Sequence, residues 1–228
     1  MKRILIGILV CLPLLATAEF NEDDWRLVTD RDDIRVFMAH SDDSRVKTFR
    51  GVTIMEIDDF MALGPQIDDY EFIASWMHMV SSLVEVDRRG PLQRDLYVTT
   101  RLPWPVNDRD APLRLNMYQD EETYSLHVDY EYDDDFVPVS ADYVRMPEMR
   151  GNIIFEPLEQ PNVQMTFEVV VDPGGYIPAW LANMILRDIP FFSMRRFRRV
   201  INSERYHDIE HDYYSLPAHW QARPQATE

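Results

Sequence analysis

A strand-like run, a turn with two glycines and the start of a long apolar segment follow one another in Asp172-Pro173-Gly174-Gly175-Tyr176-Ile177-Pro178-Ala179-Trp180-Leu181-Ala182-Asn183. Glycine adopts the left-handed backbone region without steric cost, so Gly174 and Gly175 let the chain reverse direction sharply. Pro178 lies where a first helical turn tolerates proline, because that turn has no partner for the missing N–H. The stretch therefore predicts a strand, a turn and a final helix that form one unit.

Apolar side chains alternate along the chain before this stretch, which is typical of strands with one buried face. Two short segments, Asp120-Glu121-Glu122 and Glu159-Gln160-Pro161-Asn162, separate neighbouring runs and are short enough for hairpins. The pattern predicts an antiparallel sheet. The alternating runs are Leu113, Leu115 and Met117, then Tyr124, Leu126, Val128, Tyr130 and Tyr132, and finally Met165, Phe167, Val169 and Val171.

Helical spacing occurs in residues 58–63 and 68–83 and in the final segment, from about residue 178 to near residue 211. Pro190 interrupts the final segment, which predicts a bent helix lying across the sheet. In the middle region the spaced residues are Phe72, Trp76, Met79 and Leu83; in the final segment they are Leu181, Ile185, Ile189 and Phe192, followed by Met194, Phe197 and Ile201.

The glycine turn resembles the strand-to-helix junction of START domains, the lipid-transfer module related to the steroidogenic acute regulatory protein. Four other motifs precede it in the order of that family: Asp33-Ile34-Arg35-Val36-Phe37, Phe49-Arg50-Gly51, Trp76-Met77 and Pro103-Trp104-Pro105-Val106-Asn107-Asp108-Arg109-Asp110. The family usually has an aromatic residue after the Arg-Asp pair, whereas this chain has Ala111-Pro112. The resemblance implies an α+β helix-grip fold, in which a curved antiparallel sheet wraps around a long C-terminal helix and encloses an apolar cavity.

The N-terminus has the features of a secretory signal peptide. Lys2-Arg3 precedes an apolar run from Ile4 to Leu15, and Ala16-Thr17-Ala18 supplies an A-x-A cleavage site. We therefore expect a signal peptide at residues 1–18, a START-like lipid-binding domain at 19–216 and a flexible C-terminal tail at 217–228. The expected location is periplasmic or secreted.

Composition excludes one class of partner. The chain has 40 acidic and 23 basic residues and a net charge of −17, which becomes −19 once Lys2 and Arg3 are removed with the signal peptide. Such a charge repels nucleic acid. The single cysteine, Cys11, lies in the signal peptide, so the mature domain is held by its core without a disulfide.

The resemblance implies that one lipid or hydrophobic small molecule occupies the cavity, with no cofactor. The candidate lipid-binding residues are Arg109, Trp104, Tyr130, Trp180, Met184, Ile185 and Phe192. An inward-facing Arg109 needs a partner, because an unpaired buried charge costs several kcal/mol. It would hold a ligand polar group or an acidic side chain, or it would tie residues 107–110 together by salt bridges. Aromatic and methionine side chains at helical spacing also fit a dry core without any cavity.

The predicted function is a carrier that transfers or presents its ligand in the cell envelope and is not an enzyme. Residues 103–110 and the final helix are the candidate gate. The alternative is a cyclase- or hydrolase-like helix-grip enzyme acting in the same cavity. Another enzyme pattern, His207-Asp208-Ile209-Glu210-His211, matches an inverted zinc-peptidase motif but has too little chain after it for a third ligand.

Two charge runs have open interpretations. Arg195, Arg196 and Arg199 share one flank of the final helix, where they would contact lipid phosphates during transient membrane docking or pair with nearby acids. Asp133-Asp134-Asp135 lacks the ligand spacing of a calcium loop and indicates a solvated turn.

Overall fold

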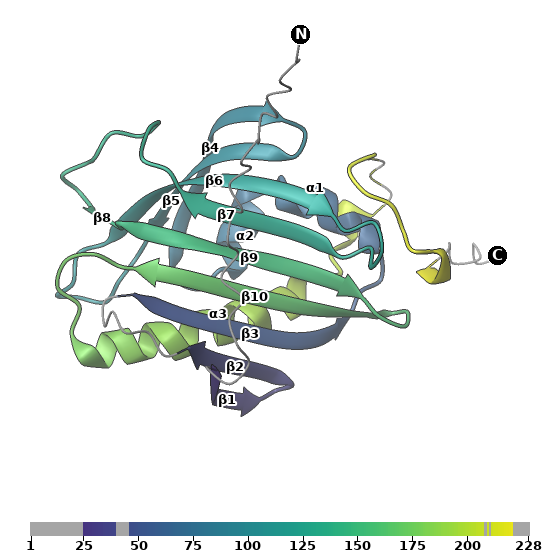
Figure 1. The fold of residues 1–228 in the computed structure, drawn as a ribbon, viewed down its shortest axis with the longest axis horizontal. Coiled ribbons are helices and arrows are strands. Elements are labelled where there is room, and N and C mark those ends of the chain that lie inside the picture. Colours follow the sequence, from purple (N-terminus) through teal and green to yellow (C-terminus); the bar gives the residue numbers. More distant parts are fainter. Residues whose placement is uncertain (1–24, 40–45, 208, 210, 221–228) are drawn as a thin grey trace, which may run out of the picture.

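The computed structural model describes residues 25–39, 46–207, 209 and 211–220. The predicted signal peptide at 1–18 lies outside the described residues. Ten strands form one sheet, and the long helix α3 packs against it (Figure 1). This is the helix-grip α+β arrangement. No helix in the described part of the chain is both long and apolar enough to span a membrane.

The elements follow one another in a simple order: strands, two short helices, more strands and a final long helix. Their bounds are β1 (Trp25–Arg31), β2 (Ile34–Ala39), β3 (Lys47–Glu56), η2 (Phe60–Ala62), α1 (Leu63–Ile67), α2 (Tyr70–Trp76), β4 (Val80–Gly90), β5 (Gln93–Thr100), β6 (Arg109–Gln119), β7 (Leu126–Tyr132), β8 (Val144–Arg145), β9 (Glu148–Pro157), β10 (Asn162–Asp172), α3 (Ala179–Val200), η3 (Glu204–Tyr206) and η4 (Ala218–Trp220).

The strand order is β1-β2-β3-β10-β9-β7-β6-β5-β4, and all of these neighbours are antiparallel. The prediction of an antiparallel sheet is confirmed, apart from the two-residue β8, which pairs parallel to β6. Both predicted hairpins are present, between β6 and β7 and between β9 and β10. The pairing of β3 with β10 joins the N-terminal strands to the rest of the sheet.

The glycine turn has the predicted backbone. Gly174 and Gly175 have φ values of +63° and +59°, and α3 begins at Ala179, directly after Pro178. The predicted apolar stripe of the helix is buried at Leu181, Ile185, Met194, Phe197 and Ile201. The strand, the turn and the helix are therefore one unit, as predicted.

Helix α3 is shorter than predicted. It ends at Val200, and a 3-10 turn at Glu204–Tyr206 follows, so the segment does not stay helical to residue 211. Pro190 lies inside the helix and is buried against the sheet. Gly51 of β3 makes this approach possible, because a Cβ there would lie 2.7 Å from the Met194 Sδ and 3.2 Å from the Pro190 Cβ.

The predicted helix at residues 68–83 is largely wrong. Helix α2 ends at Trp76, and residues from Val80 onward form β4. The backbone of Met77 is already extended, and Met79 has a φ of +69°, which breaks the helix. Val80, Val84 and Val86 are β-branched and favour a strand over a helix, and this preference outweighed the helical spacing of Met79 and Leu83.

The C-terminal segment is also more firmly attached than predicted. Trp220 in η4 is only 3% exposed, and its Nε1 donates a hydrogen bond of 2.7 Å to the Leu158 carbonyl. Its ring lies 5.5 Å from the ring of Phe60. Residues 217–220 are thus docked on the domain, and residues 221–228 lie outside the described residues.

Candidate ligand cavity

An apolar cavity of about 90 Å³ lies deep between the sheet and the helices. We call it the Trp76 cavity. Its walls come from α1, α2, β4–β7 and β9, and Phe197 of α3 closes it on the helix side. Gln66 and the Tyr130 hydroxyl bring the polar groups of the lining. The space therefore suits hydrocarbon and offers very little to a polar ligand.

A second cavity, of about 80 Å³, lies nearer the glycine turn. We call it the Arg109 cavity. It lies between β3, β10 and the middle of α3, which contributes Ile185, Ile189 and Ser193. Its lining is also mainly apolar, but His78, Thr100, Arg109 and Ser193 bring polar groups to it.

The two cavities adjoin, because the side chains of Met77, Val80 and Met149 line both of them. Met77 and Val80 come from the α2–β4 junction, and Met149 comes from β9 on the sheet. The core between the sheet and α3 is thus not uniformly filled, although each empty space is small.

Arg109 is buried, with 2% exposure, and donates to three backbone carbonyls. Its Nε lies 2.8 Å from the Pro173 oxygen, its Nη2 lies 3.1 Å from the Gly174 oxygen, and its Nη1 contacts the Asn107 oxygen. No carboxylate within the described residues forms an ion pair with it. Burial lowers the pKa of Arg109, and the nearby charge of Asp108 opposes this shift.

These contacts differ from both protein partners expected for Arg109. It holds neither an acidic side chain nor a salt bridge within residues 107–110; instead it joins the loop before β6 to the glycine turn after β10. A guanidinium has five N–H donors, and three are accounted for here. Two donors therefore remain for a ligand group.

Asp110, the next residue, faces the other way, as alternation along β6 requires. Its Oδ2 accepts hydrogen bonds from Arg145 Nη2 at 2.9 Å and from the Tyr97 hydroxyl at 2.8 Å. Burial together with this hydrogen bond raises the pKa of Tyr97 to about 12. The Arg-Asp pair of the sequence motif thus has two separate structural roles.

Three of the predicted site residues line a cavity: Tyr130 lines the Trp76 cavity, and Arg109 and Ile185 line the Arg109 cavity. The Tyr130 hydroxyl also donates to the Glu168 carbonyl at 3.1 Å. Met184 packs beside Ile185, and the ring of Phe192 lies tilted by 52° against that of His78 with centroids 5.1 Å apart. These two border the cavity wall without lining it.

Trp104 and Trp180 are placed differently from the prediction. They are 90% and 54% exposed, so neither lines a cavity. On α3 the helical rotation of about 100° per residue turns Trp180 outward while Leu181 is buried. The placement of both tryptophans around an enclosed ligand is therefore wrong, and any contact they make with lipid lies at the surface.

Most lining residues were not among the predicted site residues, including His78, Ser193, Val80 and Met149. Ser193 is fully buried, and its Oγ accepts a hydrogen bond of 2.9 Å from the His78 backbone N–H. A serine on the apolar face of a predicted helix was the available signal. Burial, with help from the charge of Arg196, lowers the pKa of His78, and Asp188 opposes the shift.

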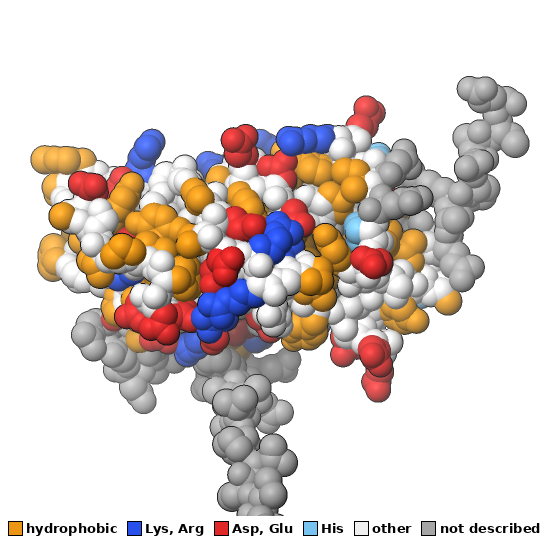
Figure 2. Space-filling model, turned by 90° about the horizontal axis from the view of Figure 1, so that it is seen from above, with side chains coloured by type: hydrophobic (Ala, Val, Ile, Leu, Met, Phe, Trp, Pro, Cys, Tyr) orange, Lys and Arg blue, Asp and Glu red, His pale blue; other side chains and the backbone are white. Residues whose placement is uncertain are grey.

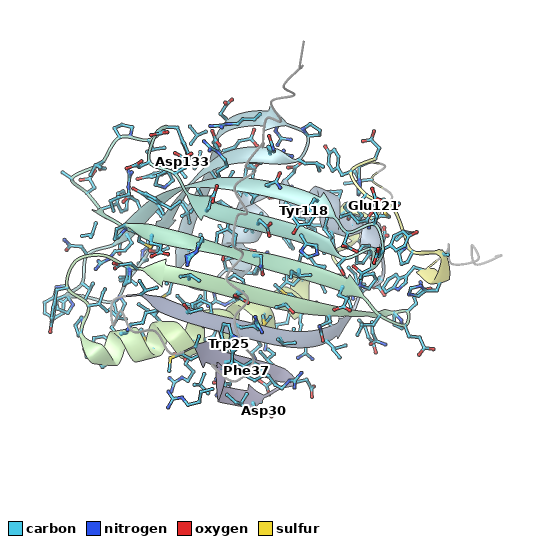
Figure 3. The ribbon with its side chains drawn as sticks, in the orientation of Figure 1. Trp25, Asp30, Phe37, Tyr118, Glu121 and Asp133 are labelled. Carbon is cyan, nitrogen blue, oxygen red and sulfur yellow. The ribbon has the colours of Figure 1, made fainter. Side chains whose placement is uncertain are left out.

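The remaining candidate sites do not contribute to the cavity. His207 follows a 3-10 turn and is extended, so the helix that the zinc motif requires is absent at this described residue. The His211 Nε2 instead contacts the Met61 carbonyl at 2.8 Å. Asp133, labelled in Figure 3, lies just after β7 and pairs with Arg114. Asp134 and Asp135 beside it are exposed, which fits the predicted solvated turn.

The basic strip of α3 is partly paired. Arg195 lies 3.5 Å from Asp32, and the neighbouring Arg198 lies 4.0 Å from Asp33. These acids lie in the β1–β2 turn, which packs beside the helix (Figure 1). The structure therefore supports pairing of Arg195 with nearby acids.

Solved START domains have a similar fold. The STAR-related lipid transfer protein of Xanthomonas axonopodis is 25% identical and has a TM-score of 0.69, with 78% of this chain and 99% of that chain covered. Human STARD10 is 17% identical over 79% of this chain and 74% of its own, and human StAR-related lipid transfer protein 5 is 12% identical over 79% and 88%, both with a TM-score of 0.69.

Among curated proteins, the uncharacterized protein PA1579 of Pseudomonas aeruginosa is 27% identical over 194 residues, which is 82% of this chain and 94% of that protein. No family model matches the chain. The similarities therefore extend over most of the chain and rest mainly on structure.

Proposed function

The chain has the START-domain fold, and from this premise we propose that it binds a single lipid or similar apolar molecule between the sheet and α3. We further propose that it carries or presents this molecule in the cell envelope, after removal of residues 1–18. A lipid-binding fold is supported by the solved lipid transfer proteins that it resembles. The identity of the ligand and the location are part of the proposal.

The observation that carries the proposal is the pair of adjoining apolar cavities under α3. Burial of each methylene of a ligand contributes about 0.8 kcal/mol, and the lining offers hydrocarbon contacts along most of its area. Among the described residues that line the cavities, none is a carboxylate and one, His78, is a histidine. This lining supports binding over acid–base catalysis, which usually needs two such groups.

Access to the cavity is proposed to occur where two loops meet the start of α3. Leu102 and Val106, from the loop before β6, pack with Ile177, Leu181 and Ile185 of the turn and the helix. Arg109 holds the same two loops together through carbonyl oxygens. Separation of these loops from α3 would open the Arg109 cavity without unfolding the sheet.

The same end of the molecule has exposed aromatic side chains. Trp104, Tyr176 and Trp180 are 90%, 82% and 54% exposed, and they flank the apolar contact just described. The turn and the start of α3 lie at the lower left of Figure 1. Hydrophobic side chains are also exposed at the left end of the face that Figure 2 shows. Tryptophan and tyrosine favour the membrane–water interface, so we propose that this end touches the membrane during exchange.

Native mass spectrometry of the protein, purified without detergent from the host that produces it and followed by organic extraction, tests the function. A lipid or other apolar molecule bound one to one is the expected result. Release of a chemically altered molecule after supply of a candidate ligand would favour the alternative, a helix-grip enzyme. Failure to retain or take up any apolar compound would refute both. N-terminal sequencing of the exported protein tests cleavage after residue 18.

A further inference from the structure

We propose that Met77, Val80 and Met149 form a movable partition, and that the ligand has a flexible hydrocarbon chain that must displace it to occupy both cavities. This inference rests on the proposed function and specifies the ligand class for the same site. The three side chains are the ones shared by the linings of the Trp76 cavity and the Arg109 cavity.

Neither cavity alone has room for a lipid. Their volumes are about 90 Å³ and 80 Å³. An apolar cavity of roughly 150 Å³ accepts one benzene molecule, which sets the scale. A ligand with a longer chain therefore needs both spaces, and the partition lies between them.

The walls of the two cavities extend along α3. Ile185 borders the Arg109 cavity and Phe197 borders the Trp76 cavity, and these two residues are separated by about 18 Å along α3. A hydrocarbon chain can follow such a path by adjusting its torsions, whereas a rigid fused-ring molecule would also require the walls to move apart. The geometry therefore favours a chain over a ring system.

The partition combines a fixed backbone with adaptable side chains. At the α2–β4 junction, the His78 N–H donates to Ser193 Oγ at 2.9 Å, and the Met79 carbonyl accepts from Arg101 N–H at 2.8 Å. These bonds hold the backbone on both sides. Methionine side chains have three rotatable bonds and repack easily, so Met77 and Met149 are the parts that can move aside.

The two cavities differ in polarity, which determines the orientation of the bound ligand. The polar groups of Arg109, His78 and Ser193 lie in one cavity, while the lining of the other is almost entirely apolar. The polar end of the ligand would therefore lie near Arg109, with the far end of the chain beyond the partition, next to Trp76.

Chain-length dependence of binding tests the partition. The probes are hexanoic, decanoic, tetradecanoic and octadecanoic acids, with binding measured by calorimetry on the wild type and on Met77→Ala/Met149→Ala. Removal of the partition should strengthen binding of the two longer acids by about tenfold or more and change hexanoic acid binding by less than about threefold, since a six-carbon chain occupies much less of the space beyond the partition. Met165→Ala is the matched control, because Met165 is fully buried but lines neither cavity.

A stiffer partition should have the opposite effect. Met149→Ile keeps a similar volume but fixes χ1, and it should weaken binding of the longer acids by about tenfold while hexanoic acid binding is retained. Thermal melts exclude misfolded variants. Equal effects on short and long acids, or no effect in either variant, would overturn the partition while leaving the proposed function intact. If the wild type binds none of the acids and retains no apolar molecule, the proposed function itself fails.

Discussion

At the scale of single residues, Arg109 shows how one side chain can connect two loops. Its guanidinium donates to carbonyls before β6 and after β10, so its removal leaves these buried acceptors without partners. Each such loss costs about 1–3 kcal/mol. We expect Arg109→Met to lower the free energy of unfolding by about 2–4 kcal/mol in urea denaturation. Arg101→Met, at an exposed arginine directly after β5, should change this free energy little.

The ligand role of Arg109 makes a different prediction. If its two remaining donors hold a ligand group, Arg109→Leu should lose the co-purified molecule while unfolding stays cooperative. A variant that retains its ligand and is only less stable would assign Arg109 to the loops alone. Native mass spectrometry and denaturation of the same sample separate the two outcomes.

Asp69 makes stability depend on pH. It caps α2 through a 2.9 Å hydrogen bond from Phe72 N–H, accepts a 2.9 Å hydrogen bond from the Tyr206 hydroxyl and forms a 2.9 Å ion pair with Arg205. Burial alone would raise the pKa of Asp69, but these three partners outweigh it and hold the pKa below the usual value of 3.8.

Because the folded pKa of Asp69 is depressed, its contribution is fully present above about pH 4 and is lost as the pH falls through the folded pKa. Asp69→Asn keeps a capping oxygen but has no charge. The wild type should therefore lose more stability than this variant on acidification below pH 4, as measured by urea denaturation across pH. Parallel curves for the two proteins would show that the carboxylate contributes nothing.

At the scale of elements, the seating of α3 on the sheet depends on Gly51. A Cβ at this position would lie too close to Met194 and Pro190, whereas a Cβ on Gly90 in β4 meets nothing within 4 Å. We expect Gly51→Ala to lower the free energy of unfolding by about 1–3 kcal/mol through overpacking. Gly90→Ala should be neutral or slightly stabilising, since it only restricts the unfolded chain. Similar melting curves for both variants would contradict this account.

The short element η4 supplies a second test. Trp220 is buried against Phe60, and Trp104 is 90% exposed. We expect Trp220→Ala to cost about 3–5 kcal/mol and Trp104→Ala to cost less than about 0.5 kcal/mol in the same denaturation experiment. A small effect of Trp220→Ala would restore the view of residues 217–220 as a loose tail.

Elements were predictable from sequence where one local pattern acted alone. Alternation of apolar residues in β6, β7 and β10 identified these strands, although both faces are buried in the first half of β6, and the paired glycines identified the turn before α3. The helix predicted for residues 68–83 was too long, because the apparent helical spacing continues into a segment rich in β-branched valines that begins at Val80. The shared lining of Met77 and Met149 could not be predicted, because it depends on contacts between segments about 70 positions apart in the chain.

At the scale of the whole molecule, membrane contact must work against a net charge of −17. Electrostatic attraction to anionic lipids is therefore not available as a general force. The exposed aromatic residues beside the proposed opening of the Arg109 cavity provide an alternative, because Trp and Tyr partition into the interface without needing lipid charge. Docking by this end would place the proposed opening directly against the bilayer.

We expect Trp104→Ala/Tyr176→Ala/Trp180→Ala to lose most vesicle binding in flotation with phosphatidylcholine vesicles, and to exchange ligand more slowly, with unchanged stability. The matched control is Leu27→Ala/Ile54→Ala/Val84→Ala, whose residues are 47–50% exposed on strands away from the loops. Binding by the aromatic residues should persist in high salt, because salt screens charge and not burial. Equal loss of vesicle binding in both triple variants would show that the protein binds membranes through no particular face. Binding that requires anionic lipid and is lost in high salt would instead assign docking to the arginines of α3.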